Sequence, residues 1–209
     1  MCRSTLVLAL TLLSLVALAP RLAVAGTPLT GTASCGTEGR FIFGPYLPLV
    51  TSPHDFNIRL KGKLQSGTCD GTGVTGGRAP LRKVTVSLRG IMPQGTDCES
   101  FLDSIAFSKS AVTVKWQGIN DAGRTVALGS SKSTVESASY DSGAERFVIT
   151  TAPIAKGAFL GSTLSIALPL GDLPEYTRVC NLVLQGEGGF STFNWGPPMN
   201  SHTVTVTVQ

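Results

Sequence analysis

Residues that could carry out catalysis are few in this chain, whose 209 residues include 2 His and 13 Asp and Glu. A nucleophilic Ser-His-Asp triad would combine Asp141-Ser142-Gly143 with His54, because it needs a hydroxyl, an imidazole and a carboxylate in hydrogen-bond contact. The flanking residues do not match that arrangement, since Tyr140 precedes Asp141 and Pro53 precedes His54. We interpret 141–143 as a hairpin turn and expect no catalytic residue and no enzymatic activity.

Metal and cofactor motifs are equally scarce. Two histidines exclude a His-rich metal site, and the chain has no H-E-x-x-H, no G-x-S-x-G and no P-loop. Cys69-Asp70 and Asn120-Asp121 could offer oxygen ligands to calcium, but the spacing of a calcium loop is missing. We therefore interpret both as solvated turns, and the sequence predicts no cofactor and no metal.

Basic side chains alternate along two segments. Arg59, Lys61 and Lys63 lie on one face of a predicted strand, and Lys83 and Arg89 lie on the polar face of another. If the two strands are neighbours, these side chains form a basic ribbon able to bind teichoic acid, an acidic polysaccharide or anionic lipid headgroups. The alternative is that they only keep an exposed sheet face or edge soluble.

Aromatic residues gather between Phe190 and Pro198. Phe193 and Trp195 flank Asn194, and exposed rings beside an amide can stack on sugars and hydrogen-bond their hydroxyls. This arrangement would fit a carbohydrate-binding module. The alternative is that the rings pack in the core, the place where we also expect Trp116.

The N-terminal segment is typical of a secretory signal peptide. Arg3 supplies the positive charge, Leu6 to Leu18 is the apolar stretch, and Ala23-Val24-Ala25 is a cleavage motif, so we expect cleavage after Ala25. Its removal leaves a secreted domain at 26–209 with 17 − 2 = 15 basic and 13 acidic residues. This small charge argues against binding to nucleic acid, and no later apolar stretch is long enough to span a membrane.

Four cysteines remain in the predicted mature chain: Cys35, Cys69, Cys98 and Cys180. An even number in an exported protein predicts two disulfides, and the absence of C-x-x-C argues against zinc and thiol-redox sites. Three pairings are possible. We favour Cys69 with Cys98, because both lie in Gly-rich loops beside strand-like segments, and Cys35 with Cys180 by elimination.

The elements that must position these residues are β-strands, since apolar and polar residues alternate with a period of two along the mature chain. Asn120 to Gly123 and Asp141 to Gly143 supply turn residues, so 111–129 and 132–151 are predicted hairpins. One helical turn is expected from Glu99 to Ile105, and a flexible loop from Gly67 to Gly77. The predicted strands cover 56–64, 83–89, 112–117, 163–168 and 203–208, with weaker patterns at 29–35, 40–44, 124–129, 132–139, 145–151 and 179–185.

About ten short strands with local connections predict an all-β, antiparallel fold. Two packed sheets in a β-sandwich are favoured, while a closed barrel remains an alternative. No internal repeat and no linker indicate a second domain.

Loose motifs over nearly all of the mature chain resemble a broad group of uncharacterised secreted bacterial proteins, best known from actinobacteria. The resemblance implies an Ig-like β-sandwich with disulfide bonds, and it carries no assigned activity or site residue. In chain order the motifs are Gly31-Thr32-Ala33-Ser34-Cys35, Phe41-x-Phe43, Pro45-x-Leu47, Leu60-x-Gly62-x-Leu64, Cys69, Asp97-Cys98, Val114-Lys115-Trp116, Gly157-Ala158-Phe159-x-Gly161 and Cys180.

Together these patterns predict a secreted, non-catalytic protein that acts as a binding or cell-envelope interaction module. Its partner would be a component of the cell envelope or an extracellular polymer. The alternatives are a carbohydrate-binding module and a secreted hydrolase of an unrecognised kind.

Overall fold

The computed structural model describes residues 27–47, 58–96, 107–141, 143–144, 146–169, 190–195 and 204–209. The predicted signal peptide with its predicted cleavage site, the helical turn predicted at 99–105 and the strand predicted at 179–185 lie outside these residues. The described residues contain no apolar helix of the length that a bilayer span requires.

The described residues form β-strands joined by turns, which confirms the all-β prediction, and the pairing between strands is antiparallel. Alternating burial along β5 and β13 reflects the period-two pattern of the sequence. The strands are β1 (Thr30–Gly31), β2 (Ala33–Leu47), β3 (Ile58–Asp70), β4 (Val74–Thr75), β5 (Leu81–Met92), β6 (Ser108–Ile119), β7 (Thr125–Ser133), β8 (Val135–Asp141), β9 (Arg146–Thr151), β10 (Lys156–Gly157), β11 (Leu164–Pro169), β12 (Phe190–Trp195) and β13 (Val204–Val208).

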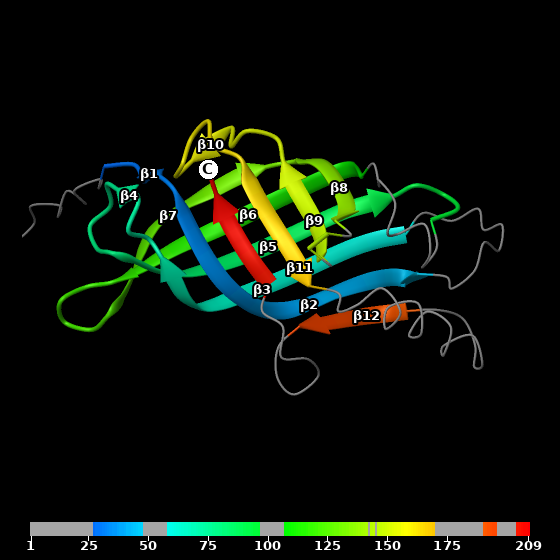
Figure 1. The fold of residues 1–209 in the computed structure, drawn as a ribbon, viewed down its shortest axis with the longest axis horizontal. Coiled ribbons are helices and arrows are strands. Elements are labelled where there is room, and N and C mark those ends of the chain that lie inside the picture. The colour runs from blue at the N-terminus through cyan, green and yellow to red at the C-terminus, as the bar shows by residue number, and fades with distance from the viewer. Residues whose placement is uncertain are drawn as a thin grey trace, which may run out of the picture.

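One sheet of eleven strands holds nearly all of these elements, in the order β10-β7-β6-β5-β3-β2-β13-β11-β9-β8 with β12 paired to β2. The sheet curls, so that β13, β11 and β9 cross over β5, β6 and β7 (Figure 1). A single cluster of buried side chains from both halves fills the space between them. The separate small sheet pairs β1 with β4 at one end.

Thr134 connects β7, the second strand in the sheet order, to β8, the last one. The carbonyl of Thr134 accepts a hydrogen bond from the N–H of Ala152 at 2.9 Å, and Ser110 Oγ accepts one from the N–H of Val135 at 2.9 Å. These contacts bring the two end regions of the sheet together. The curl therefore lets one half of the large sheet cover the apolar inner face of the other half.

Both predicted hairpins are present, β6 with β7 and β8 with β9. In the first turn the Asn120 carbonyl accepts from the N–H of Gly123 at 2.8 Å, while Asn120 Oδ1 accepts from the N–H of Arg124 at 2.9 Å. Gly123 has a φ of 72°, a conformation that glycine adopts without strain. Turn chemistry thus specified these local pairings, as the sequence indicated.

Trp116 lies in the core, which confirms its prediction. Its ring packs edge-on against Phe159, with ring centroids 4.8 Å apart. The indole N–H donates to Ser131 Oγ at 2.8 Å, and the Ser131 hydroxyl donates to the carbonyl of Ala158 at 2.5 Å. These two consecutive hydrogen bonds provide partners for the polar groups that become buried when Trp116 packs in the core.

The two weak strand patterns at 29–35 and 40–44 belong for the most part to one long strand, β2. A register shift between Gly36 and Thr37 interrupts the alternation without ending the strand. Gly39 allows close approach to β3, since a Cβ there would lie 2.1 Å from the carbonyl oxygen of Lys63. Along one side β2 pairs first with β13 and then with β12, and along the other side it pairs with β3.

The predicted disulfide pairings are wrong, because Cys35 is bonded to Cys69. The two residues are register partners on β2 and β3, with Cα atoms 4.1 Å apart. The expectation failed because Cys69 was assigned to a loop, whereas β3 continues to Asp70. Cys98 and Cys180 lie outside the described residues.

Besides the two-residue β10, two segments that were not predicted as strands are strands in the structure. The predicted loop 67–77 contains the end of β3 and the whole of β4, and the aromatic segment contains β12. Both depend on distant partners: β4 pairs with β1, and β12 pairs with β2. Strands rich in Gly, Ser and Thr carry little alternation from which to predict them.

Candidate functional site

The two strands that carry the predicted basic ribbon, β3 and β5, are neighbours in the sheet, and β2 lies on the other side of β3. Lys61 pairs with Arg89 of β5, and Lys63 pairs with Arg40 of β2. Paired residues in an antiparallel sheet project from the same face. We call the exposed basic side chains of β2, β3 and β5 on this outer surface the cationic face: Arg40, Arg59, Lys61, Lys63 and Arg89.

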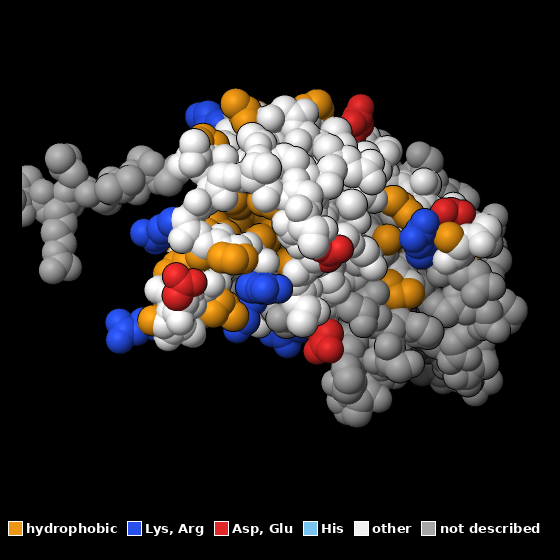
Figure 2. Space-filling view, turned by 60° about the vertical axis from the view of Figure 1, so that its left-hand side comes forward, with side chains coloured by type: hydrophobic (Ala, Val, Ile, Leu, Met, Phe, Trp, Pro, Cys, Tyr) orange, Lys and Arg blue, Asp and Glu red, His pale blue; other side chains and the backbone are white. Residues whose placement is uncertain are grey.

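Little negative charge balances the cationic face. In the part of the chain that the structure describes, the one ion pair joins Arg146 Nε to Asp141 Oδ2 at 3.8 Å, so none of these five cations is paired with a described carboxylate. Glu38 is the acidic residue nearest to it along β2, two positions from Arg40. Figure 2 shows one face of the molecule, on which Lys and Arg side chains lie scattered, with Asp and Glu side chains between them.

Lys83 does not join this group. It lies on β5, six residues from Arg89, which is about 20 Å along a strand. Its register partner is Gln117 of β6 rather than a residue of β3, and its side chain is half-buried. The cationic face therefore contains four of the five predicted basic residues, together with Arg40, which the sequence pattern did not single out.

Phe193 and Trp195 lie on β12, where they pair with Phe41 and Gly39 of β2. Their backbone is described but their side chains are not. The pairing shows that β12 is a strand added to the long β2. A sugar-stacking role for the two rings stays a prediction.

Asp141 takes part in the turn between β8 and β9. Its Oδ1 accepts hydrogen bonds from the N–H of Gly143 at 3.1 Å and of Ala144 at 3.2 Å, between β8 and β9. This is the local bonding expected of Asp in a hairpin turn. Ser142 and His54 lie outside the described residues.

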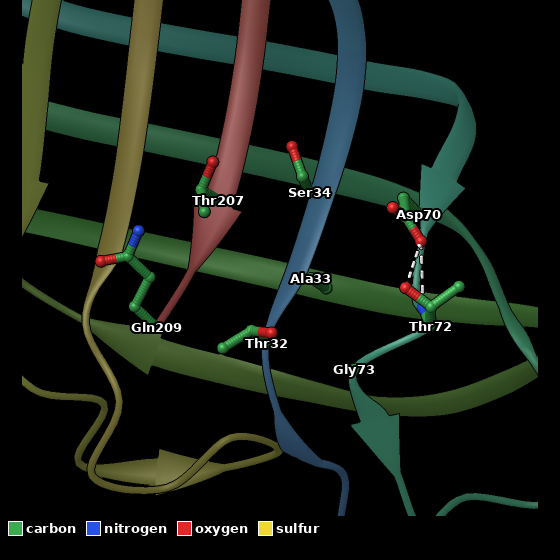
Figure 3. A pocket seen from close by; sticks show the side chains of 8 residues that line it. All are labelled: Thr32, Ala33, Ser34, Asp70, Thr72, Gly73, Thr207 and Gln209. Atoms are coloured by element: carbon green, nitrogen blue, oxygen red, sulfur yellow. Dashed lines mark hydrogen bonds between the residues drawn. The ribbon is translucent and has the colours of Figure 1, made fainter.

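A pocket of about 530 Å³ lies where β2 begins and where β3 and β13 end (Figure 3). Ser34 is the register partner of both Asp70 and Thr207, so the sheet places these three side chains in one row. Thr32, Thr72 and Gln209 complete the polar lining.

Asp70 is the one charged side chain of this pocket. Its Oδ1 accepts hydrogen bonds from the N–H and the Oγ1 of Thr72, at 3.0 and 2.9 Å (Figure 3). These bonds favour the ionised form and lower the pKa of Asp70 below its ordinary value of 3.8. The pocket therefore presents a carboxylate at neutral pH, held in place by the turn of which it is a part.

The far wall of the pocket depends on glycine at position 73. The carbonyl of Gly73 accepts a hydrogen bond from the N–H of Thr32 at 3.3 Å. A Cβ on Gly73 would lie 2.5 Å from Thr32 Oγ1, so a side chain there would collide with the pocket lining. No sequence pattern indicated this pocket, because β2, β3 and β13 converge on it from distant parts of the chain.

No group of three or more His, Cys, Asp or Glu that could hold a metal ion occurs within the described ranges. No protein family, no curated protein and no solved structure matches this chain. The geometry of the cationic face and of the pocket is therefore what supports a function.

Proposed function

We propose that the protein is a secreted, non-catalytic module that binds an anionic polymer of the cell envelope or extracellular space through its cationic face. Two like-charged pairs across neighbouring strands, Lys61 with Arg89 and Lys63 with Arg40, carry this proposal. Cationic side chains directly opposite one another repel and destabilise a sheet. A bound polyanion would remove that cost.

The position of Lys61 and Lys63 within the sheet supports a role in binding rather than a role in protecting a sheet edge. Charged side chains often occur on edge strands, where they prevent pairing with other molecules. β3 is a central strand, since β2 and β5 cover both of its edges. Lys61 and Lys63 therefore protect no open edge.

The spacing of the charges fits an extended ligand better than a single ion. Alternate residues on a strand lie about 7 Å apart and neighbouring strands about 5 Å apart, so the cationic face forms a regular grid. Arg59 and Lys63 span about 13 Å along β3. Teichoic acid and acidic polysaccharides repeat their charge along a chain, and can contact several positions of the grid together.

The test is salt-dependent retention on heparin and on isolated cell-wall material. We expect the double variant Lys61→Glu/Lys63→Glu to elute at clearly lower salt than the wild type. The matched control, Arg78→Glu/Arg124→Glu, changes the net charge equally but alters exposed residues in turns. Equal shifts for the two variants would mean that net charge, not the cationic face, governs retention, and would refute the proposal.

The Ig-like sandwich class and export after cleavage at Ala25 stay part of this proposal. Support for the class comes from the all-β antiparallel fold, whose curled sheet encloses one core. Support for export comes from the N-terminal sequence and from the disulfide, because disulfides persist in oxidising compartments.

A further inference from the structure

We infer that the pocket formed by β2, β3 and β13 binds neighbouring hydroxyl groups of an uncharged pyranose sugar. This site is separate from the cationic face and does not depend on the charge of a polymer. Its residues are Thr32, Ser34, Asp70, Thr72, Thr207 and Gln209.

Polar side chains without a hydrogen-bond partner among the described residues converge on the pocket. Within the described residues, the hydroxyls of Thr32, Ser34 and Thr207 and the side-chain amide of Gln209 make no hydrogen bond to another residue. Ser34 and Thr207 face the pocket from neighbouring strands (Figure 3). Such groups both donate and accept, as sugar hydroxyls do.

The carboxylate of Asp70 is held in place by one of its two oxygens. Thr72 donates twice to Oδ1, which fixes the carboxylate, whereas Oδ2 has no partner among the described residues. A carboxylate oxygen is a strong acceptor for a hydroxyl, and bonds to an ionised group are about twice as strong as neutral ones. A fixed acceptor also loses little side-chain entropy when a ligand binds.

The lining selects for a neutral ligand. No Lys, Arg or His is among the eight residues that line the pocket, so Asp70 would repel an anion. A metal ion would find one carboxylate and no cluster of ligands in the described part of the chain. The volume, about 530 Å³, lies within the range of sites for small organic ligands.

The pocket and the cationic face share the outer surface of β2. Ser34 and Arg40 are six residues apart, about 20 Å along a strand. If the proposed function holds, one polymer with charged and uncharged units could contact both. Neutral glycosides test the pocket alone, so failure at one site can be distinguished from failure at the other.

The experiment is saturation-transfer NMR with the methyl glycosides of glucose, galactose, mannose and N-acetylglucosamine, on the secreted chain. We expect transfer to at least one of them, and at least fivefold weaker binding for Asp70→Asn and for Ser34→Ala/Thr207→Val. Asp141→Asn is the matched control, because Asp141 also accepts backbone hydrogen bonds in an exposed turn. Lys61→Glu/Lys63→Glu should bind the glycoside as the wild type does.

Thermal unfolding of each variant establishes that it is folded before binding is measured. No transfer to any of the four glycosides overturns the inference. Equal binding by the wild type and Asp70→Asn overturns it as well. Calcium binding that depends on Asp70, without any glycoside binding, would assign the pocket to a cation and would also overturn it.

Discussion

Asp70 shows how one turn can set the charge of a pocket. Hydrogen bonds from Thr72 lower the pKa of this carboxyl, so the ionised form is favoured in the folded protein. Because the folded pKa lies below the unfolded one, the carboxylate stabilises the fold above the unfolded pKa. That contribution is lost as pH falls through the folded pKa.

Glycoside binding should therefore be insensitive to pH from about 7 to about 4.5 and decline only at lower pH, because Asp70 stays ionised over that range. Asp70 is the only titratable side chain of the lining. Saturation-transfer NMR recorded over a series of pH values measures this pH dependence of binding. A midpoint near pH 6 would contradict the assignment of Asp70 as the acceptor.

Ser131 is a second residue whose role is local and testable. Ser131→Ala removes the acceptor of the buried Trp116 N–H and the donor to the Ala158 carbonyl. We expect a loss of about 1–3 kcal/mol in the free energy of unfolding, because buried polar groups lose their partners. Urea denaturation followed by Trp fluorescence measures the loss.

The exposed neighbour Ser130 provides the control for that substitution. Ser130→Ala should change the free energy of unfolding by no more than about 0.5 kcal/mol. Similar losses for the two variants would show that the hydrogen bonds of Ser131 do not account for the effect.

At the scale of elements, the pairing of β2 with β3 organises both candidate sites. It aligns Ser34 with Asp70 at the pocket and Arg40 with Lys63 on the cationic face. It also brings Cys35 opposite Cys69. Disturbing this one pairing should affect the stability of the fold and both sites together.

Substitutions of Gly39 and Gly44 by alanine test how closely β2 and β3 must approach each other. A Cβ at Gly39 would lie 2.1 Å from Lys63 O, whereas at Gly44 the nearest atom, Arg59 O, is 4.0 Å away. Gly39→Ala should therefore destabilise by about 1–3 kcal/mol or more, and Gly44→Ala by less than about 0.5 kcal/mol. Equal shifts in melting temperature would contradict the register.

The disulfide links the same two strands and closes a loop with a sequence separation of 34. The chain-entropy relation gives about 4 kcal/mol for a loop of this size. Replacing both residues, Cys35→Ala/Cys69→Ala, should lower the free energy of unfolding by about 2–4 kcal/mol. An unchanged denaturation midpoint under oxidising conditions would show that the bond adds no stability.

At the scale of the whole molecule, the sheet curls until β7 and β8 meet at Thr134. This encloses apolar side chains that a flat sheet of this size would leave in water. The outer face remains polar, and it is there that the cationic face and the pocket lie. The buried core and the two proposed binding sites thus lie on opposite faces of one sheet.

The protein purified from culture supernatant should begin at Gly26 and contain no free thiol. The four cysteines of that chain would then form two disulfides, one joining Cys35 to Cys69 and the other joining the remaining pair, Cys98 and Cys180. N-terminal sequencing and non-reducing peptide mapping measure both. A peptide linking Cys69 to Cys98 would contradict this.

Local features were predictable from the sequence alone. The alternation at 83–89 and 203–208, the turn at Asn120 to Gly123 and the burial of Trp116 all follow from side-chain period and turn chemistry. The basic alternation at Arg59 to Lys63 likewise placed three cations on one exposed face.

Tertiary structure alone decided which distant strands became neighbours. Cys35 faces Cys69, Arg40 faces Lys63 and Thr207 faces Ser34 because the sheet curls in one register. The alternation within a strand identifies its buried face but not its partner, since many pairings bury that face equally well. The all-β class and the exposed cations could therefore be predicted from the sequence. The disulfide pairing and the pocket could not, because they depend on which distant strands pair and in which register.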